Sequence, residues 1–268
     1  MDNVVHCLYC HSKFDERYYS FPPAPRSEGI GGAAFEEDFG IVYGANITPS
    51  ALGDWSDGEV IQAITEGVNK KGESLFPIMS YPQLRFMSTE DVYSVVSYLR
   101  TLEPISNKVS AKKLKFPLGY IERTFPKPWT PQPQPDPANK VAYGKYLATI
   151  ANCIMCHTPT DKMGKPLPGM YLAGGQRFRF QGGEVFSTNL TPDLESGIGN
   201  RSQQEFIDLF RSFKDPIVVP PDKKSENTVM PWMAFAGMTD EDLGAIFAFL
   251  RSVKSVKNVV EKWPAKEG

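Results

Sequence analysis

The sequence predicts an all-α protein made of two tandem domains, related by an internal repeat and joined by a proline-rich linker. Three observations support this fold class. Each half repeats the same ordered motifs, apolar residues between the motifs recur at helical spacing, and no stretch shows convincing strand alternation. A chain of 268 residues also favours two domains over one. The expected bounds are 1–104 for the first domain, 105–138 for the linker and 139–268 for the second domain.

Each half begins with a cysteine-rich motif. Segments 7–11 and 153–157 both read C-x-x-C-H, and together they contain all four cysteines and two of the three histidines. This spacing is the attachment signal for haem c, because the two thiols add to the two vinyl groups of the haem. The histidine that follows then lies beneath the iron as an axial ligand. The predicted haem-binding residues are Cys7, Cys10, Cys153 and Cys156, and the predicted proximal iron ligands are His11 and His157.

Other uses of four cysteines fit the sequence less well. A single structural zinc site would leave both adjacent histidines unexplained and would require pairs from opposite halves of the chain to converge. A thioredoxin-like redox pair needs a βαβ context, which the sequence lacks. Disulfides within each C-x-x-C pair have poor geometry. Covalent attachment of two haem c groups is therefore the preferred interpretation.

The middle helix of each half is marked by a capping box. Ser56 and Ser202 stand at the expected N-caps, and Glu59 and Glu205 follow three residues later. Apolar residues then recur at helical spacing in both halves. Upstream of each box, a glycine-led apolar segment is followed by the motif N-I-T-P or N-L-T-P.

A methionine loop and a closing helix complete each half. The loops P-I-M-S-Y at 77–81 and P-W-M-A-F at 231–235 correspond to each other. After each loop, a methionine precedes the expected N-cap of the closing helix, which is Ser88 in one half and Thr239 in the other. A methionine at that position is typical of a hydrophobic staple.

The second axial ligand of each iron is predicted to be methionine. Only His6 remains after the motif histidines, and it abuts Cys7 on the attachment side, which excludes bis-histidine ligation for at least one haem. A thioether sulfur suits iron and raises the reduction potential. Of nine methionines, the repeat singles out Met79 and Met233, with Met230 as the competitor in the second half.

Helical patterning stops between the halves. Seven prolines punctuate residues 105–138, ending in P-Q-P-Q-P, a composition that favours extended polyproline geometry and a semi-rigid spacer. The lysines that precede these prolines are expected to be solvated, with docking of an acidic partner as the weaker alternative: Lys108, Lys112, Lys113 and Lys115.

Composition gives no indication of a nucleic-acid or membrane partner. The formal net charge is −2, and the sequence contains neither a secretory signal nor an apolar stretch of about twenty residues. Haem attachment at C-x-x-C-H normally takes place outside the cytoplasmic membrane, so the expected location is the periplasm or the outer face of that membrane. Only six residues precede Cys7, whereas two turns of helix lead into Cys153. We therefore expect the first helix to be cut short and the natural protein to extend further back.

As an ordered set, these motifs resemble the c-type haem subunits of membrane-associated bacterial alcohol, aldehyde and sugar-acid dehydrogenases, and related multihaem cytochromes. The shared pieces are C-x-x-C-H, N-I/L-T-P, a W-S-x-x-E helix start, a P-x-M loop and a closing M-S/T-x-E-D helix. The resemblance covers both halves and implies cytochrome c-like domains with histidine–methionine iron. The chain differs from many such subunits in having two haem motifs rather than three, a long linker, and Arg201 where the first half has Trp55.

The resemblance implies an electron carrier with no catalysis of its own, a dihaem cytochrome that passes electrons between a dehydrogenase or another redox donor and a respiratory acceptor. Any association with a membrane would depend on partners or on segments outside this chain. The alternative is a dihaem cytochrome c peroxidase, which needs an open distal position and a nearby acid–base residue. Glu59 and Glu205 are already explained as capping residues, and no other residue is marked for that role. A haem-based gas sensor is a third, remote option.

Overall fold

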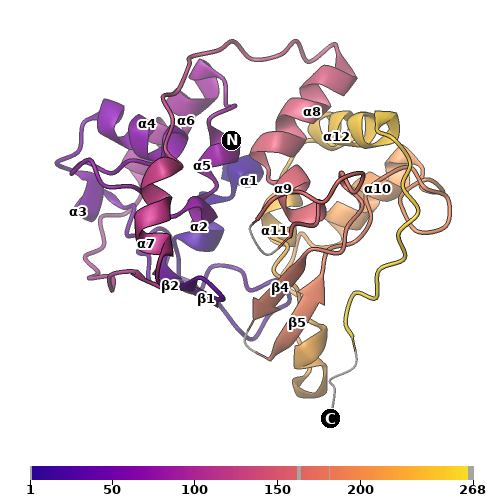
Figure 1. Cartoon of the computed structure of the whole chain (residues 1–268), viewed down its shortest axis with the longest axis horizontal. Helices are drawn as coiled ribbons and strands as arrows, with labels where there is room; N and C mark the ends of the chain where they lie inside the picture. Colours follow the sequence, from indigo (N-terminus) through magenta and orange to yellow (C-terminus); the bar gives the residue numbers. More distant parts are fainter. Residues whose placement is uncertain (1, 162–163, 181, 265–268) are drawn as a thin grey trace. The chain divides into compact units, whose positions relative to one another are not determined.

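The computed structural model describes residues 2–161, 164–180 and 182–264 and divides into two compact units (Figure 1). Unit 1 contains Met1–Asp15 and Pro23–Gln134, and unit 2 contains Glu16–Pro22 and Pro135–Gly268. A short segment of the first half of the sequence therefore belongs to unit 2. The division into domains at residues 104 and 139 stays a prediction.

Unit 1 is built from short elements and one long closing helix. Its helices are α1 (Asp2–Val5), α2 (Cys7–Cys10), α3 (Pro49–Leu52), α4 (Asp57–Thr65), the 3-10 helix η1 (Pro77–Met79), α5 (Tyr81–Leu84), α6 (Thr89–Thr101), α7 (Leu118–Ile121) and the 3-10 helix η2 (Glu122–Thr124). Its strands are β1 (Ala34–Glu37), β2 (Gly40–Tyr43) and β3 (Lys113–Leu114).

Unit 2 repeats this order and begins with a helix of 11 residues. Its helices are α8 (Lys140–Ile150), α9 (Cys153–His157), α10 (Gln203–Arg211), the 3-10 helix η3 (Pro221–Glu226), α11 (Trp232–Phe235) and α12 (Asp240–Ser252). Its strands are β4 (Arg177–Phe180) and β5 (Gly183–Phe186).

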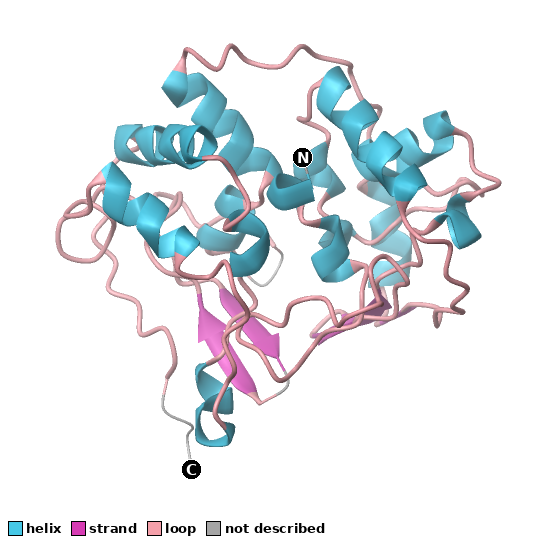
Figure 2. Ribbon diagram, turned by 180° about the vertical axis from the view of Figure 1, so that it is seen from behind, coloured by secondary structure: helices cyan, strands magenta, loops and turns pink. Residues whose placement is uncertain are grey.

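The expectation of an all-α fold is wrong, because each unit contains a small antiparallel sheet (Figure 2). In unit 1 the order is β1-β2-β3, with Phe35 opposite Val42, and in unit 2 Phe178 lies opposite Val185. The strands β1, β2, β4 and β5 are four residues long, and only β1 and β4 alternate between exposed and half-buried side chains. A pattern this brief does not stand out from helical patterning in the sequence. The fold is therefore a mixture of helices and strands.

Both predicted capping boxes are confirmed. Ser56 Oγ accepts the N–H of Glu59, whose carboxylate accepts the N–H of Ser56 at 2.7 Å, and Ser202 and Glu205 repeat this arrangement.

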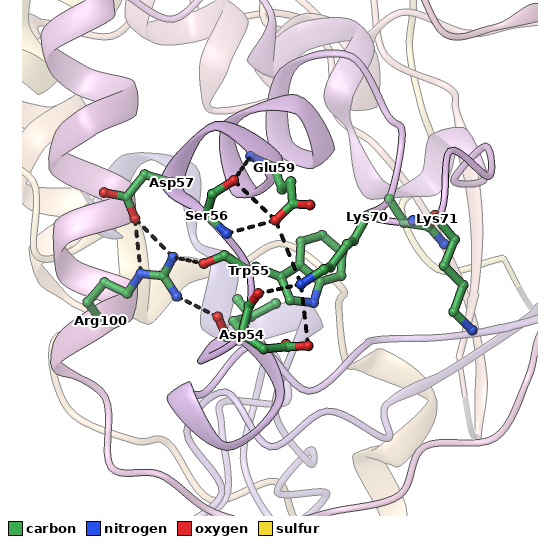
Figure 3. A network of polar contacts seen from close by, with 10 residues as sticks. Asp54, Trp55, Ser56, Asp57, Glu59, Lys70, Lys71 and Arg100 are labelled. Carbon is green, nitrogen blue, oxygen red and sulfur yellow. Dashed lines mark hydrogen bonds and ion pairs between the residues drawn. The ribbon is translucent and has the colours of Figure 1, made fainter.

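In unit 1 the capping box is joined to the closing helix α6 through Arg100 (Figure 3). Arg100 on α6 donates to the carbonyls of Leu52 and Trp55 at 2.6 and 2.7 Å, and it also pairs with the Asp57 carboxylate. One guanidinium therefore fixes where α4 begins relative to α6.

The closing helices α6 and α12 begin as predicted. Ser88 accepts the N–H of Asp91, and Thr239 accepts the N–H of Asp242, so each first turn has a side-chain cap. The side chains of the methionines before these caps are buried, with exposed fractions of 0% for Met87 and 4% for Met238. Their burial agrees with a packing role and separates them from the loop methionines.

The Asn-x-Thr-Pro motifs tie the loop after each hairpin to the chain beyond the closing helix. Asn46 Oδ1 accepts the N–H and the hydroxyl of Thr48, while its Nδ2 donates to the carbonyl of Ile105 at 2.8 Å. In unit 2, Asn189 makes the same contacts with Thr191 and Val256. The motif is thus explained by its structural role.

Residues 105–134 run along unit 1. Asn107 donates to the carbonyl of Ile30, and the N–H of Trp129 donates to Glu66 at 2.8 Å. Lys112 forms an ion pair of 2.6 Å with the buried carboxylate of Glu122. This segment is therefore held to unit 1 by side-chain contacts along its length.

The first and last helices of unit 2 pack closely at Gly144 on α8. A Cβ atom built at Gly144 would lie 1.8 Å from the carbonyl oxygen of Ala245 on α12, a contact that requires one backbone to move. At Gly244 on α12, the three atoms nearest to an added Cβ all belong to the side chain of the exposed Gln203. The two glycines therefore offer a matched test of this crossing.

We predict that Gly144→Ala lowers the free energy of unfolding of the haem-loaded protein by about 1–3 kcal/mol, since overpacking a close crossing costs this much. Gly244→Ala should have little effect, because Gln203 can rotate into solvent. Chemical denaturation followed by far-ultraviolet circular dichroism measures both. Equal effects of the two substitutions would contradict the close α8–α12 contact.

Candidate haem-binding sites

Each C-x-x-C-H motif folds as a short helix that begins after a left-handed residue. His6 precedes α2 with φ 41°, and Asn152 precedes α9 with φ 62°. The ring of His6 lies 3.1 Å from the carbonyl of Val4 through its Nδ1. His6 and Asn152 thus occupy the same position, at which the chain turns into the motif.

The four cysteines, all within the described residues, are half-buried and form no disulfide with one another, and two lie in each unit. Burial raises the pKa of Cys10 to about 11 and that of Cys153 to about 12. Low polarity around the thiols favours their uncharged form. Surroundings of this kind suit contact with the apolar edge of a macrocycle.

Both motif histidines are buried and oriented by a backbone carbonyl. His11 Nδ1–H donates to the carbonyl of Ala45 at 2.7 Å, and His157 Nδ1–H donates to that of Thr188 at the same distance. A carbonyl only accepts, so Nδ1 carries the proton and Nε2 keeps its lone pair. Burial lowers the pKa of His11, and it lowers that of His157 to about 4. Each imidazole is therefore neutral at pH 7 and able to ligate a metal through Nε2.

A glycine in each unit allows the close approach that places this carbonyl. Gly31 N–H donates to the carbonyl of His11, and Gly174 N–H donates to that of His157, both at 2.8 Å. Both glycines have a left-handed φ near 72°, and an added Cβ would lie 2.5 Å from Ala45 or 2.4 Å from Thr188. Sequence analysis missed these two residues, although the Gly-Gly pairs at 31–32 and 174–175 were an available signal.

The structure brings each predicted thioether into the same unit as its histidine. Met79 ends η1 in unit 1 with His11, and Met233 lies in α11 of unit 2 with His157. Both methionines are half-buried, as is Met230. These three methionines are therefore more exposed than Met87 and Met238, which are buried.

The residues present fit haem c. Each unit holds two thiols, one neutral imidazole and a half-buried thioether, which is the donor set that a covalently attached, six-coordinate haem requires. Each unit also contains a buried indole N–H, on Trp129 or Trp232, that has no hydrogen-bond partner within the described residues. Buried donors of this kind need an acceptor, and the propionate groups of a haem can provide one.

The two cysteine pairs lie in different units. Within the described residues, no group of three or more histidine, cysteine, aspartate or glutamate side chains is placed to hold a metal ion together. No helix in residues 2–161, 164–180 or 182–264 has the length and apolar character needed to cross a bilayer.

Comparison with known proteins agrees with this donor set. The family described as Cytochrome c matches residues 141–254. A cytochrome c subunit of a quinone-dependent alcohol dehydrogenase from Gluconacetobacter polyoxogenes is 28% identical, over 93% of this chain and 54% of that protein. The fructose dehydrogenase cytochrome subunit of Gluconobacter japonicus is 29% identical, over 83% of this chain and 47% of that protein. The chain thus spans about half the length of these two relatives.

A third relative is matched by this chain over most of its length. The dihaem c-type cytochrome of Cereibacter sphaeroides is 23% identical, over 94% of this chain and 83% of that protein. The resemblance predicted from the motifs is confirmed: the chain matches the Cytochrome c family over residues 141–254 and is similar, over most of its length, to cytochrome c subunits of bacterial dehydrogenases and to a dihaem cytochrome c.

Proposed function

We propose that the protein carries electrons from a dehydrogenase to a respiratory acceptor through two haem c groups, one in each unit. The observation that supports this most directly is the duplicated histidine site. His11 and His157 are both buried, and each donates an Nδ1–H bond of 2.7 Å to a backbone carbonyl. The cytochrome c domain carries the electron-transfer role, and its C-x-x-C-H motif occurs again in unit 1.

Haem c supplies one-electron exchange at its iron. The residues of this chain attach it, ligate it and exclude water. Cys7 and Cys10 hold the haem of unit 1, and Cys153 and Cys156 hold that of unit 2. The backbone carbonyl fixes each imidazole ring and would strengthen its Nε2 as a donor to the haem iron.

A thioether on the opposite face completes each site in this proposal. Met79 and Met233 would supply this sulfur ligand, which would favour the reduced state and so raise the potential. Two six-coordinate irons have no position open for a substrate, which favours a carrier over an enzyme. A dihaem peroxidase would require one iron with an exchangeable distal position.

The names of the relatives support the choice of electron donor, and the site of haem attachment supports the location. Their names describe cytochrome subunits of alcohol and fructose dehydrogenases, so we assign a dehydrogenase as the electron donor of this chain. Because haem c is attached outside the cytoplasmic membrane, we assign the protein to the periplasm or to the outer face of that membrane.

We predict two covalently attached haems per chain when the protein is expressed with the haem c maturation machinery. Intact mass spectrometry of the denatured, acid-extracted protein should show two haem increments. Replacing Cys153 and Cys156 together by serine should remove one increment, because the thioethers of unit 2 can no longer form. The Cys7→Ser, Cys10→Ser pair is the matched control for unit 1, and a wild-type mass with fewer than two increments would contradict the proposal.

We also predict that Met79→Ala and Met233→Ala each remove about half of the near-infrared sulfur-to-iron band of the oxidised protein, since each removes one of two thioether ligands. The potential of the affected haem should fall, and that iron should bind added ligands. Wild-type protein should bind carbon monoxide slowly and turn over little peroxide.

Met230→Ala is the control in unit 2 and should leave the band intact. Loss of the band in this variant, with Met233→Ala unaffected, would move the ligand to Met230 and leave the electron-carrier function standing. A native high-spin haem together with efficient peroxide reduction would replace the carrier by the peroxidase.

A further inference from the structure

We propose that Lys262 and Tyr19 form a propionate-binding site for the haem of unit 2, and that this site raises the reduction potential of that haem above that of unit 1. The inference rests on the proposed function, since it requires a haem beside His157. It assigns a role to two residues that neither the attachment motif nor the axial ligands explain.

The C-terminal tail lies beside the segment that supports the proximal histidine. The carbonyl of Lys262 accepts the N–H of Phe186, the last residue of β5, at 3.0 Å. Thr188, two residues beyond Phe186, provides the carbonyl that orients His157.

The Lys262 ammonium is half-buried between the aromatic rings of Tyr19 and Trp263. Its Nζ lies 4.1 Å from the centroid of the Trp263 ring and donates to the hydroxyl of Tyr19 at 3.2 Å. Among the described residues it forms no salt bridge with a carboxylate. Burial lowers the pKa of Lys262, as expected for a cation partly removed from water without a counter-ion. Such a cation is stabilised by an anion placed beside it.

Tyr19 adds a neutral donor to this cation. Its oxygen accepts from Lys262, so its own O–H is directed elsewhere, and within the described residues it donates to no other group. Burial raises the pKa of Tyr19 to about 12, which keeps the hydroxyl protonated. An ammonium and a phenol held 3.2 Å apart suit the two oxygens of one carboxylate. The haem carries two such groups as its propionates.

The segment that carries Tyr19 is fixed in unit 2. The N–H of Tyr19 donates to the carbonyl of Ile217, and the N–H of Ser20 donates to Asn227 Oδ1, both at 2.7 Å. Asn227 is only 2% exposed, and its carbonyl accepts Trp263 Nε1–H at 2.8 Å. One buried asparagine therefore holds both the Tyr19 segment and the Lys262 tail, so the two donors are preorganised.

At the corresponding position, the described part of unit 1 has no lysine. Asn107 and Asn258 are matching positions, since each donates to a carbonyl that precedes the Gly-Gly pair of its unit. Four residues beyond Asn258 stands Lys262, whereas four residues beyond Asn107 stands Ala111. The neighbouring Lys112 of unit 1 is already paired with Glu122. A fixed positive charge beside only one haem favours the reduced form of that haem, so the two potentials should separate.

The test uses the full-length, haem-loaded protein. The variants are Lys262→Met, Lys262→Arg, Tyr19→Phe and, as a matched control, Lys257→Met, which removes an exposed lysine of the same tail that pairs with Glu195. Spectroelectrochemical titration gives the midpoint potential of each haem, and the shifted step in Met79→Ala identifies the haem of unit 1. Resonance Raman spectra report on the propionates through their bending band.

Lys262→Met should lower the equilibrium constant for reduction of the unit 2 haem by about tenfold, which is about 59 mV for one electron. It should also shift the propionate band. Tyr19→Phe should shift the potential in the same direction by less, Lys262→Arg should retain most of the wild-type potential, and Lys257→Met should change neither haem.

Unchanged potentials and an unchanged propionate band in Lys262→Met, with two haems and both sulfur ligands retained, would overturn this inference and leave the proposed function intact. Absence of a haem from unit 2 of the wild type would overturn both. Should Lys262→Met not fold, Tyr19→Phe decides through the propionate band, because its ring stacking on Phe213 is preserved.

Discussion

The hydrogen bond from a buried histidine to a backbone carbonyl is the interaction on which each unit depends. To place the carbonyl of Ala45 against His11, the chain must bring the loop after a hairpin back over the C-x-x-C-H helix. Gly31 makes that approach possible, because any side chain would collide with Ala45, and Gly174 does the same at Thr188. The hairpins, the glycines and the Asn-x-Thr-Pro loops all serve to hold one acceptor in position. Their repetition in both units is the structural basis for assigning both the same chemistry.

Features specified by neighbouring residues could be predicted from the sequence. The capping boxes at Ser56 and Ser202 and the caps at Ser88 and Thr239 were predicted because a cap depends on residues three positions apart. Attachment cysteines and proximal histidines could likewise be proposed from their spacing. The sheets could not, because β3 reaches β2 from more than half the length of unit 1 away and each strand is short.

Contacts between segments that are far apart in the sequence could not be predicted, because no local sequence pattern marks them. Nothing near Tyr19 in the sequence indicates that it meets Lys262, and the need for glycine at residue 31 appears only when the loop at Ala45 is folded over it. The sulfur ligands could not be identified from the sequence for the same reason. A half-buried methionine has the same local sequence pattern in a hydrophobic core and at a metal ion, and this applies to Met79, Met230 and Met233.

The membership of Glu16–Pro22 in unit 2 has a consequence for the order in which the protein is made. The N–H of Ser20 meets Asn227 across 207 residues of sequence, so unit 2 closes around a segment that leaves the ribosome long before its partners. Contacts of such sequence separation form late and slowly, because loop closure costs entropy before the contacts stabilise the fold. During synthesis, the seven residues 16–22 would have to wait for their partners in unit 2 until the C-terminal tail is made. The last stretch of the chain, rather than the second attachment motif, then completes unit 2.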